Sequence, residues 1–131
     1  MTHEDRELLL KDLCGRLPYG VKIQTPTNCW TSEEGICELK EIFKGDDGLF
    51  RIGDVGALIE YSKPYLFPMS SMTGEQKEEY CRLQERVIYN SKGLVNIDIM
   101  NYINWCYKNH LDINNLIPLG LAKDATGLNI Y

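Results

Sequence analysis

Apolar and polar residues along this chain follow three successive patterns. Residues 2–17 show helical spacing, residues 21–61 contain short alternating stretches, and residues 74–117 return to helical spacing. Between the last two patterns, Pro64 and Pro68 bracket the apolar run at 65–67. Proline lacks a backbone donor and favours an extended conformation in the residue before it. We therefore predict that residues 64–68 cross the core and are neither a helix nor a central strand.

The first pattern predicts a helix that begins after Thr2. Threonine can cap the first turn, where Glu4 and Asp5 suit the helix dipole. The sequence Pro-Tyr-Gly at 18–20 ends the helix. We expect its buried stripe to consist of Leu10, Leu13, Cys14 and Leu17, with Leu9 beside it.

The second pattern predicts four short strands, at 21–25, 36–44, 49–52 and 57–61. Turns rich in Gly and Asp separate the last three. The alternation slips near Lys40, which is typical of a bulge. Because connections this short cannot form parallel crossovers, we expect an antiparallel meander that could curl toward a small barrel.

The third pattern predicts two longer helices and a short one. Thr73 and Gln76 have the spacing of a capping box before a helix from residue 74 to about residue 90. A further helix is expected from Asn96 or Asp98 to residue 109, and Asp112 can cap a short last helix at 113–117. The whole pattern predicts one α+β domain over residues 1–131, in which a helix and a small antiparallel sheet pack against the later helices.

Charge and composition narrow the classes of function. Residues 1–60 hold 7 Lys or Arg against 12 Asp or Glu, whereas residues 61–131 hold 7 of each. An acidic half beside a neutral half argues against nucleic-acid binding. No stretch approaches the ~20 apolar residues of a membrane span, and the charged start does not resemble a signal peptide. Five cysteines without paired spacing then favour a reduced, cytoplasmic protein with no disulfide framework.

Cys106 and His110 form the one spacing that resembles a chemical site. They stand at i and i+4 on a predicted helix, the geometry of a chelating pair or of a nucleophile and its base. A structural zinc site needs two further ligands, and the sequence has no CxxC or HxxxH motif to supply them. The simpler interpretation is a core cysteine and a helix-terminal histidine. We therefore expect no metal and no cofactor, and favour a protein that is not an enzyme.

Three aromatic residues are candidates for binding another protein: Trp105, Tyr102 and Trp30. Trp105 lies on the side of the predicted helix away from Ile103, together with polar residues. Another element, such as the tail at 123–131, covers it, or it is an exposed anchor of the kind found in binding hot spots. Trp30, in a polar loop, presents the same two alternatives.

Three stretches resemble a known family: RELLLKDLCGRLPYGVK at 6–22, KPYLFPMSSMTGEQKEEY at 63–80 and WCYKNHLDINNLIPLGLA at 105–122. Together they are similar to a family of small uncharacterised proteins encoded by gut bacteria, often in prophages and other mobile elements. The resemblance implies that genomic setting and transfers no functional residues. With the assembled motifs of catalysis missing from the sequence, we predict a small protein-interaction module. A small enzyme or metal site at Cys106 and His110, or a nucleic-acid accessory protein, are the alternatives.

Overall fold

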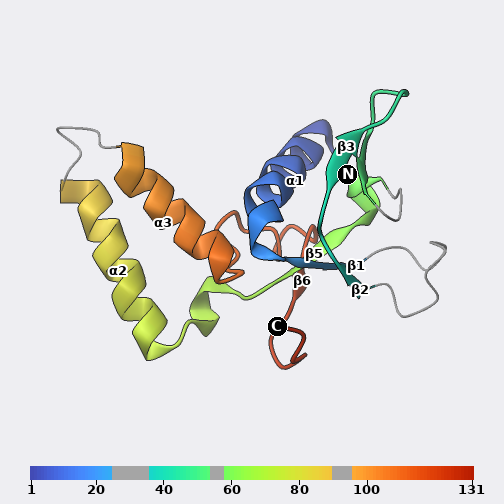
Figure 1. Ribbon diagram of the computed structural model, residues 1–131. Coiled ribbons are helices and arrows are strands. Elements are labelled where there is room, and N and C mark those ends of the chain that lie inside the picture. Colours follow the sequence, from blue (N-terminus) through green and yellow to red (C-terminus); the bar gives the residue numbers. More distant parts are fainter. Residues whose placement is uncertain (25–35, 54–57, 90–95) are drawn as a thin grey trace.

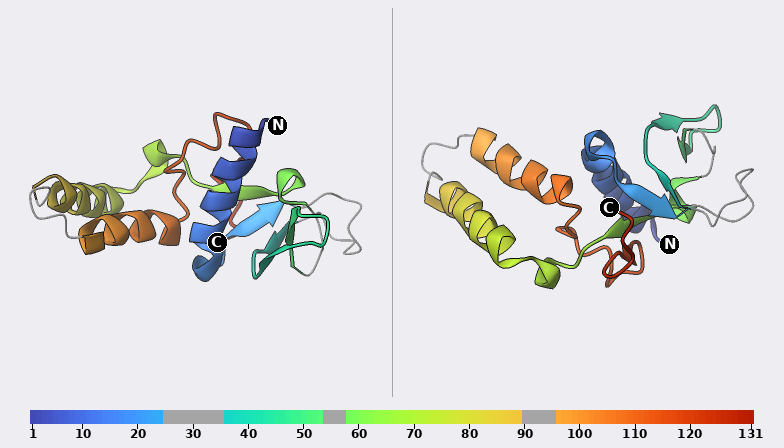
Figure 2. Two further views of the ribbon diagram at one scale, coloured as in Figure 1. Left: turned by 90° about the horizontal axis from the view of Figure 1, so that it is seen from above. Right: turned by 60° about the horizontal axis from the view of Figure 1, so that its bottom comes forward.

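The computed structural model describes residues 1–24, 36–53, 58–89 and 96–131, and these residues form two parts. We call helices α2 (Gly74–Tyr89) and α3 (Asn96–Lys108) the arm, and all other described residues the body. The arm projects from one side of the body as two antiparallel helices (Figure 1), and both views of Figure 2 show the same separation. The predicted α+β class is confirmed.

The body is built around helix α1 (His3–Arg16). It begins at a capping box, as Thr2 Oγ1 accepts a hydrogen bond from Asp5 N–H at 3.1 Å and Asp5 Oδ2 accepts one from Thr2 N–H at 3.2 Å. The 3-10 helix η1 (Leu17–Tyr19) follows, and Gly20 turns the chain into the sheet with a φ of 68°. The core cluster draws on α1, the strands and the segment after the arm: Leu9, Leu13, Val21, Ile23, Leu39, Ile52, Ile59, Leu66, Leu116, Leu121 and Ala122.

Four strands form one mixed sheet, in the order β2 (Ile36–Glu38), β1 (Lys22–Gln24), β5 (Lys63–Leu66) and β6 (Lys123–Asp124). β1 is antiparallel to both of its neighbours, whereas β5 and β6 are parallel. The prediction of an antiparallel meander is therefore wrong. The short connections between the first strands do not permit parallel pairing. The connection from β5 to β6 contains the whole arm, and a connection of that length does permit it.

A separate hairpin pairs β3 (Ile42–Lys44) with β4 (Phe50–Ile52). The slip predicted near Lys40 is the point where the expected strand at 36–44 divides into β2 and β3. The strand expected at 57–61 is instead a single bridge at Leu58 followed by the 3-10 helix η2 (Ile59–Tyr61). No closed barrel is formed by the strands that the structure describes.

The proline-bracketed segment contains a central strand, β5, which corrects the prediction for residues 64–68. Pro64 is tolerated there because of the side that its nitrogen faces. The Leu66 carbonyl accepts a hydrogen bond from Ala125 N–H at 2.8 Å, so it faces β6. Backbone groups alternate sides along a strand, so the Pro64 nitrogen also faces away from β1. The missing donor therefore removes no bond to β1. It removes none to β6 either, because pairing with β6 begins only at Tyr65.

The arm begins after the 3-10 helix η3 (Met69–Ser71). The predicted capping box is confirmed, because Gln76 N–H donates to Thr73 Oγ1 at 3.1 Å and Gln76 Oε1 accepts from Thr73 N–H at 2.9 Å. α2 makes its main tertiary contacts with α3 and not with the sheet, whereas α3 also contacts α1. This differs from the expected packing, because α2 is charged around much of its circumference and one neighbouring helix covers its narrow apolar stripe.

Residues 112–117 form turns, so the predicted short last helix is wrong. The Asp112 carboxylate nevertheless caps the segment, accepting hydrogen bonds from Leu116 N–H at 2.7 Å and Ile117 N–H at 2.9 Å. Asn115 has a φ of 56°, in the left-handed region, which a helix interior does not allow.

Candidate interaction surface

The far end of the arm exposes large apolar side chains. Ile88, near the end of α2, is 60% exposed, and Ile97 and Met100, at the start of α3, are 57% and 59% exposed. The end of α2 and the start of α3 lie at the same end of the arm, away from the body (Figure 1). We call these three residues the arm tip. Large apolar side chains left in water on a protein surface are candidates for contact with another protein.

Charge is scarce on α3. Of its 13 residues only Asp98 and Lys108 are charged. Ile97 lies between Asn96 and Asp98 in the sequence, and Met100 stands next to Asn101. The exposed side of α3 therefore offers apolar contacts and neutral hydrogen-bonding groups.

The aromatic candidates Trp105 and Tyr102 lie on the inner side of the arm. The Tyr102 hydroxyl is 2.9 Å from the Tyr80 hydroxyl of α2, and the two rings are 5.6 Å apart. Trp105 is half-buried, with its ring 6.4 Å from that of Tyr80, so the neighbour that partly covers it is α2. Burial, followed by the hydrogen bond with Tyr80, raises the pKa of Tyr102 above its usual range. Trp30 lies outside the described residues.

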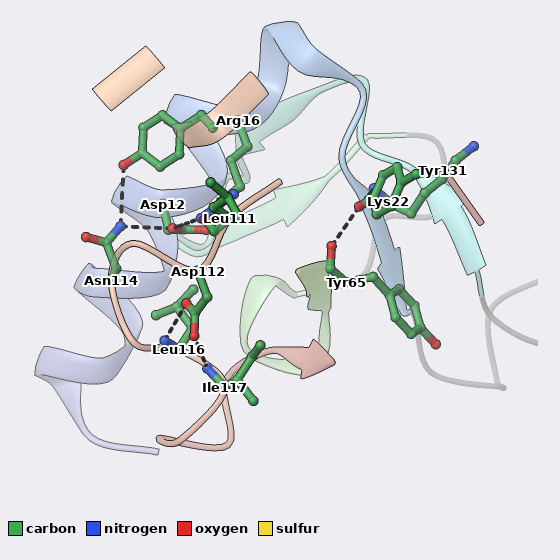
Figure 3. A network of polar contacts seen from close by, with 11 residues as sticks. Asp12, Arg16, Lys22, Tyr65, Leu111, Asp112, Asn114, Leu116, Ile117 and Tyr131 are labelled. Carbon is green, nitrogen blue, oxygen red and sulfur yellow. Dashed lines mark hydrogen bonds and ion pairs between the residues drawn. The ribbon is translucent and has the colours of Figure 1, made fainter. Parts of the chain in front are cut away.

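A buried ion pair fixes the root of the arm to the body. Arg16 Nε donates to Asp12 Oδ2 at 2.7 Å and Arg16 Nη2 donates to Asp12 Oδ1 at 3.1 Å, and neither side chain is exposed. Nη2 also donates to the carbonyl oxygen of Leu111, just after α3, at 2.6 Å (Figure 3). The buried face of α1 is thus rotated from the predicted stripe: it consists of Leu9, Asp12, Leu13 and Arg16, and Cys14 is exposed.

Tyr107 of α3 completes this junction. The Arg16 guanidinium lies 4.7 Å from the centre of the Tyr107 ring. The same ring lies so close to α1 that a Cβ on Gly15 would be 2.4 Å from it, which explains why a glycine stands there. Asn114 donates to Asp12 Oδ1 at 2.9 Å. The contacts of α1, α3 and the following loop therefore converge on one buried pair.

Cys106 and His110 lie near this junction, and burial keeps both side chains uncharged at neutral pH. Cys106 is fully buried, and burial raises the pKa of its thiol to about 11. Burial, with the charge of Arg16 acting in the same direction, lowers the pKa of His110 to about 4. Both groups are therefore neutral at pH 7, and a neutral thiol is a weak nucleophile and a poor metal ligand. No group of three His, Cys, Asp or Glu in the described parts of the chain could hold a metal ion.

Among the described residues, two cavities are lined by parts of the body and by the root of the arm. One of about 280 Å³ lies between α1 and the β3–β4 hairpin and is lined mainly by apolar side chains, including Leu10 and Phe50. The other, of about 300 Å³, lies at the root of the arm, with Gln76 and Asn109 in its lining. Neither lining joins a nucleophile to a base, so these cavities do not indicate a reaction.

Comparisons with protein-family models, with curated proteins and with solved structures find no match for this chain. The resemblance to proteins of prophages and mobile elements therefore stays a prediction. Within the described ranges, no helix has both the length and the apolar character needed to cross a membrane.

Proposed function

We propose that the protein is a non-catalytic interaction module that binds another protein through the arm tip. The observation that supports this is the exposure of Ile88, Ile97 and Met100, each of which leaves more than half of its surface in water. Moving such side chains into an interface releases about 25 cal/mol for each Å² of apolar surface buried. The buried junction at Arg16 holds the root of the arm, so the arm tip can be occupied without rearranging the core.

The chemistry of the arm tip indicates what kind of partner would fit. Because α3 has only two charged residues, recognition of the α3 side of the arm tip would rest on apolar contact and neutral hydrogen bonds, and the partner surface that meets it should be apolar and weakly charged. Such binding depends little on salt, unlike binding to nucleic acid, which weakens steeply as salt rises. A cytoplasmic partner encoded by the host or by the same mobile element would agree with the family resemblance.

The test compares two exposed apolar positions. Met100→Glu places a charge in the arm tip, and Leu119→Glu places one at a residue of the body that is 54% exposed. We expect immobilised wild type and Leu119→Glu to retain the same partner from a lysate of the producing cells. Met100→Glu should lose it while keeping the wild-type melting temperature.

Salt separates this proposal from its alternatives. The partner should stay bound between about 0.1 M and about 1 M salt, where the Debye length falls from ~10 Å to ~3 Å. Equal capture by Met100→Glu and wild type would contradict the proposal. Capture that is abolished by high salt, or by nuclease treatment, would favour nucleic-acid binding instead.

A further inference from the structure

The Tyr131 hydroxyl lies between two strands of the main sheet. Lys22 N–H of β1 donates to the Tyr131 hydroxyl at 2.7 Å, and that hydroxyl donates to the Tyr65 carbonyl of β5 at 2.7 Å. Figure 3 shows the phenol reaching between the two backbone groups. One hydroxyl therefore serves as acceptor to one strand and donor to the next.

The position of this hydroxyl is that of a missing ladder bond. β1 and β5 pair Gln24 with Lys63 and Ile23 with Pro64, so the next antiparallel pair would be Lys22 with Tyr65. The Leu66 carbonyl faces β6, and the carbonyls of successive residues in a strand point to opposite sides, so the Tyr65 carbonyl faces β1. The hydroxyl replaces the direct bond from Lys22 N–H to this carbonyl, and the pairing of β1 with β5 ends at this point.

Two further aromatic side chains contact the ring of Tyr131. It stacks on the His110 imidazole with 3.8 Å between ring centres and 15° between planes, and lies 5.7 Å from the Phe67 ring at 54°. Tyr131 as a whole is 43% exposed, so it lies at the surface of the protein with its hydroxyl between the two strands. Burial raises the pKa of Tyr131 to about 12, so the hydroxyl keeps the proton that it donates.

We propose that Lys22, Tyr65, Phe67 and His110 form a binding site for a phenol side chain, the phenol slot, which Tyr131 fills in cis. The slot supplies one donor, one acceptor and two aromatic neighbours, and a para-substituted phenol satisfies all of them. When Tyr131 leaves, the slot accepts a tyrosine from another polypeptide. This inference does not depend on the arm tip, because none of the slot residues belongs to the arm.

The slot can be tested by emptying it. Tyr131→Ala removes the occupant, and p-cresol, the side chain of tyrosine as a free molecule, serves as the probe. We expect saturating p-cresol to raise the melting temperature of Tyr131→Ala by roughly 2–6 °C and to leave wild type, whose slot is filled, unchanged. Toluene and 4-methylanisole, which cannot donate a hydrogen bond, should have little effect. An equal rise with toluene, or an equal rise in wild type, would overturn the proposal.

A peptide probe distinguishes a free phenol from a tyrosine carried on a chain. The heptapeptide Ala-Thr-Gly-Leu-Asn-Ile-Tyr, which copies residues 125–131, should stabilise Tyr131→Ala, whereas its version ending in Phe should not. The control variant is Tyr61→Ala, whose side chain is 62% exposed, and neither p-cresol nor the peptide should stabilise it. Stabilisation by both peptides alike would overturn the recognition of the hydroxyl.

A second variant keeps the proposal testable should Tyr131→Ala fail to fold. Tyr131→Phe keeps the stacked ring but leaves Lys22 N–H and the Tyr65 carbonyl without the bridging hydroxyl. We expect its melting temperature to fall by several degrees below that of wild type, without recovery in p-cresol because the ring still fills the slot. A Tyr131→Phe protein as stable as wild type would overturn the proposal.

Discussion

Helix α1 of the body has 14 residues and buries Leu9, Asp12, Leu13 and Arg16. Helix α2 of the arm is longer, with 16 residues, yet Leu83 is its only buried side chain among those described. Cys106 is the one buried side chain among those described in α3. The helices of the body and of the arm are thus similar in length but differ in how many of their side chains are buried.

This difference indicates where stability and adaptability lie. The hydrophobic contribution to folding grows with the apolar area buried, so most of it comes from the body. The arm is held by α2–α3 contacts and by the junction at its root. Substitutions on its outer surface should therefore cost little stability, which leaves that surface free to change with a partner.

The sharpest test of this comparison removes an arginine from each part. Arg16→Ala leaves the Asp12 carboxylate buried without its partner, and we expect the free energy of unfolding to fall by about 3–5 kcal/mol. Arg82→Ala breaks the pair with Glu79 on α2, whose side chains are 58% and 34% exposed, and should cost less than about 1 kcal/mol. Urea unfolding followed by circular dichroism measures both. Similar losses in the two variants would remove the distinction between body and arm.

Acid should lower the stability of the fold through His110. The pKa of His110 is about 4 in the folded protein against an ordinary value of 6.5, so between these values the unfolded chain binds a proton that the folded chain does not. Stability is therefore lost as pH falls from about 6.5 to about 4.

The matched variant is His110→Asn, because asparagine tolerates the φ of 57° at this position. Comparing urea midpoints at about pH 7 and about pH 4.5, we expect wild type to lose more stability on acidification than the variant does. The same loss in both proteins would show that His110 carries no part of the acid sensitivity.

The smallest effect is expected inside the arm. Tyr102→Phe removes the hydroxyl that pairs with Tyr80 at 2.9 Å, and we expect a loss of about 0.5–1.5 kcal/mol, measured by thermal unfolding. Tyr61→Phe, at an exposed position of the body, is the control and should be neutral. A loss above about 3 kcal/mol for Tyr102→Phe would mean that the arm interior stabilises the fold as strongly as the core does.

Local signals in the sequence predicted the helices α1, α2 and α3, but not the turns at 113–117. The caps at Thr2 and Thr73 depend on residues three apart, and the structure contains both. Strand partners depend on distant residues, and β6 has only two residues, too few for an alternating pattern. The sheet order and the central position of β5 could therefore not be predicted from spacing.

The candidate site was predicted only in part. Asp12 and Arg16 stand at i and i+4, a spacing usually found on solvated helix faces, so their burial gave no signal in the pattern of apolar residues. Trp105 and Tyr102 were found as aromatics off the main stripe of α3, but α2 lies on that side of the helix. Ile97 and Met100 are exposed because the arm projects away from the body. The spacing of apolar residues does not predict the direction in which a helix pair projects.

The place of β5 in the sheet has a consequence for synthesis of the chain. β5 lies between β1, from residues 22–24, and β6, from residues 123–124, so its two edges are satisfied by segments about a hundred residues apart. While a ribosome is still translating the arm, one side of this strand has no neighbour. The sheet can close only after residues 123–124 emerge, and pairings so distant in sequence are slow to form.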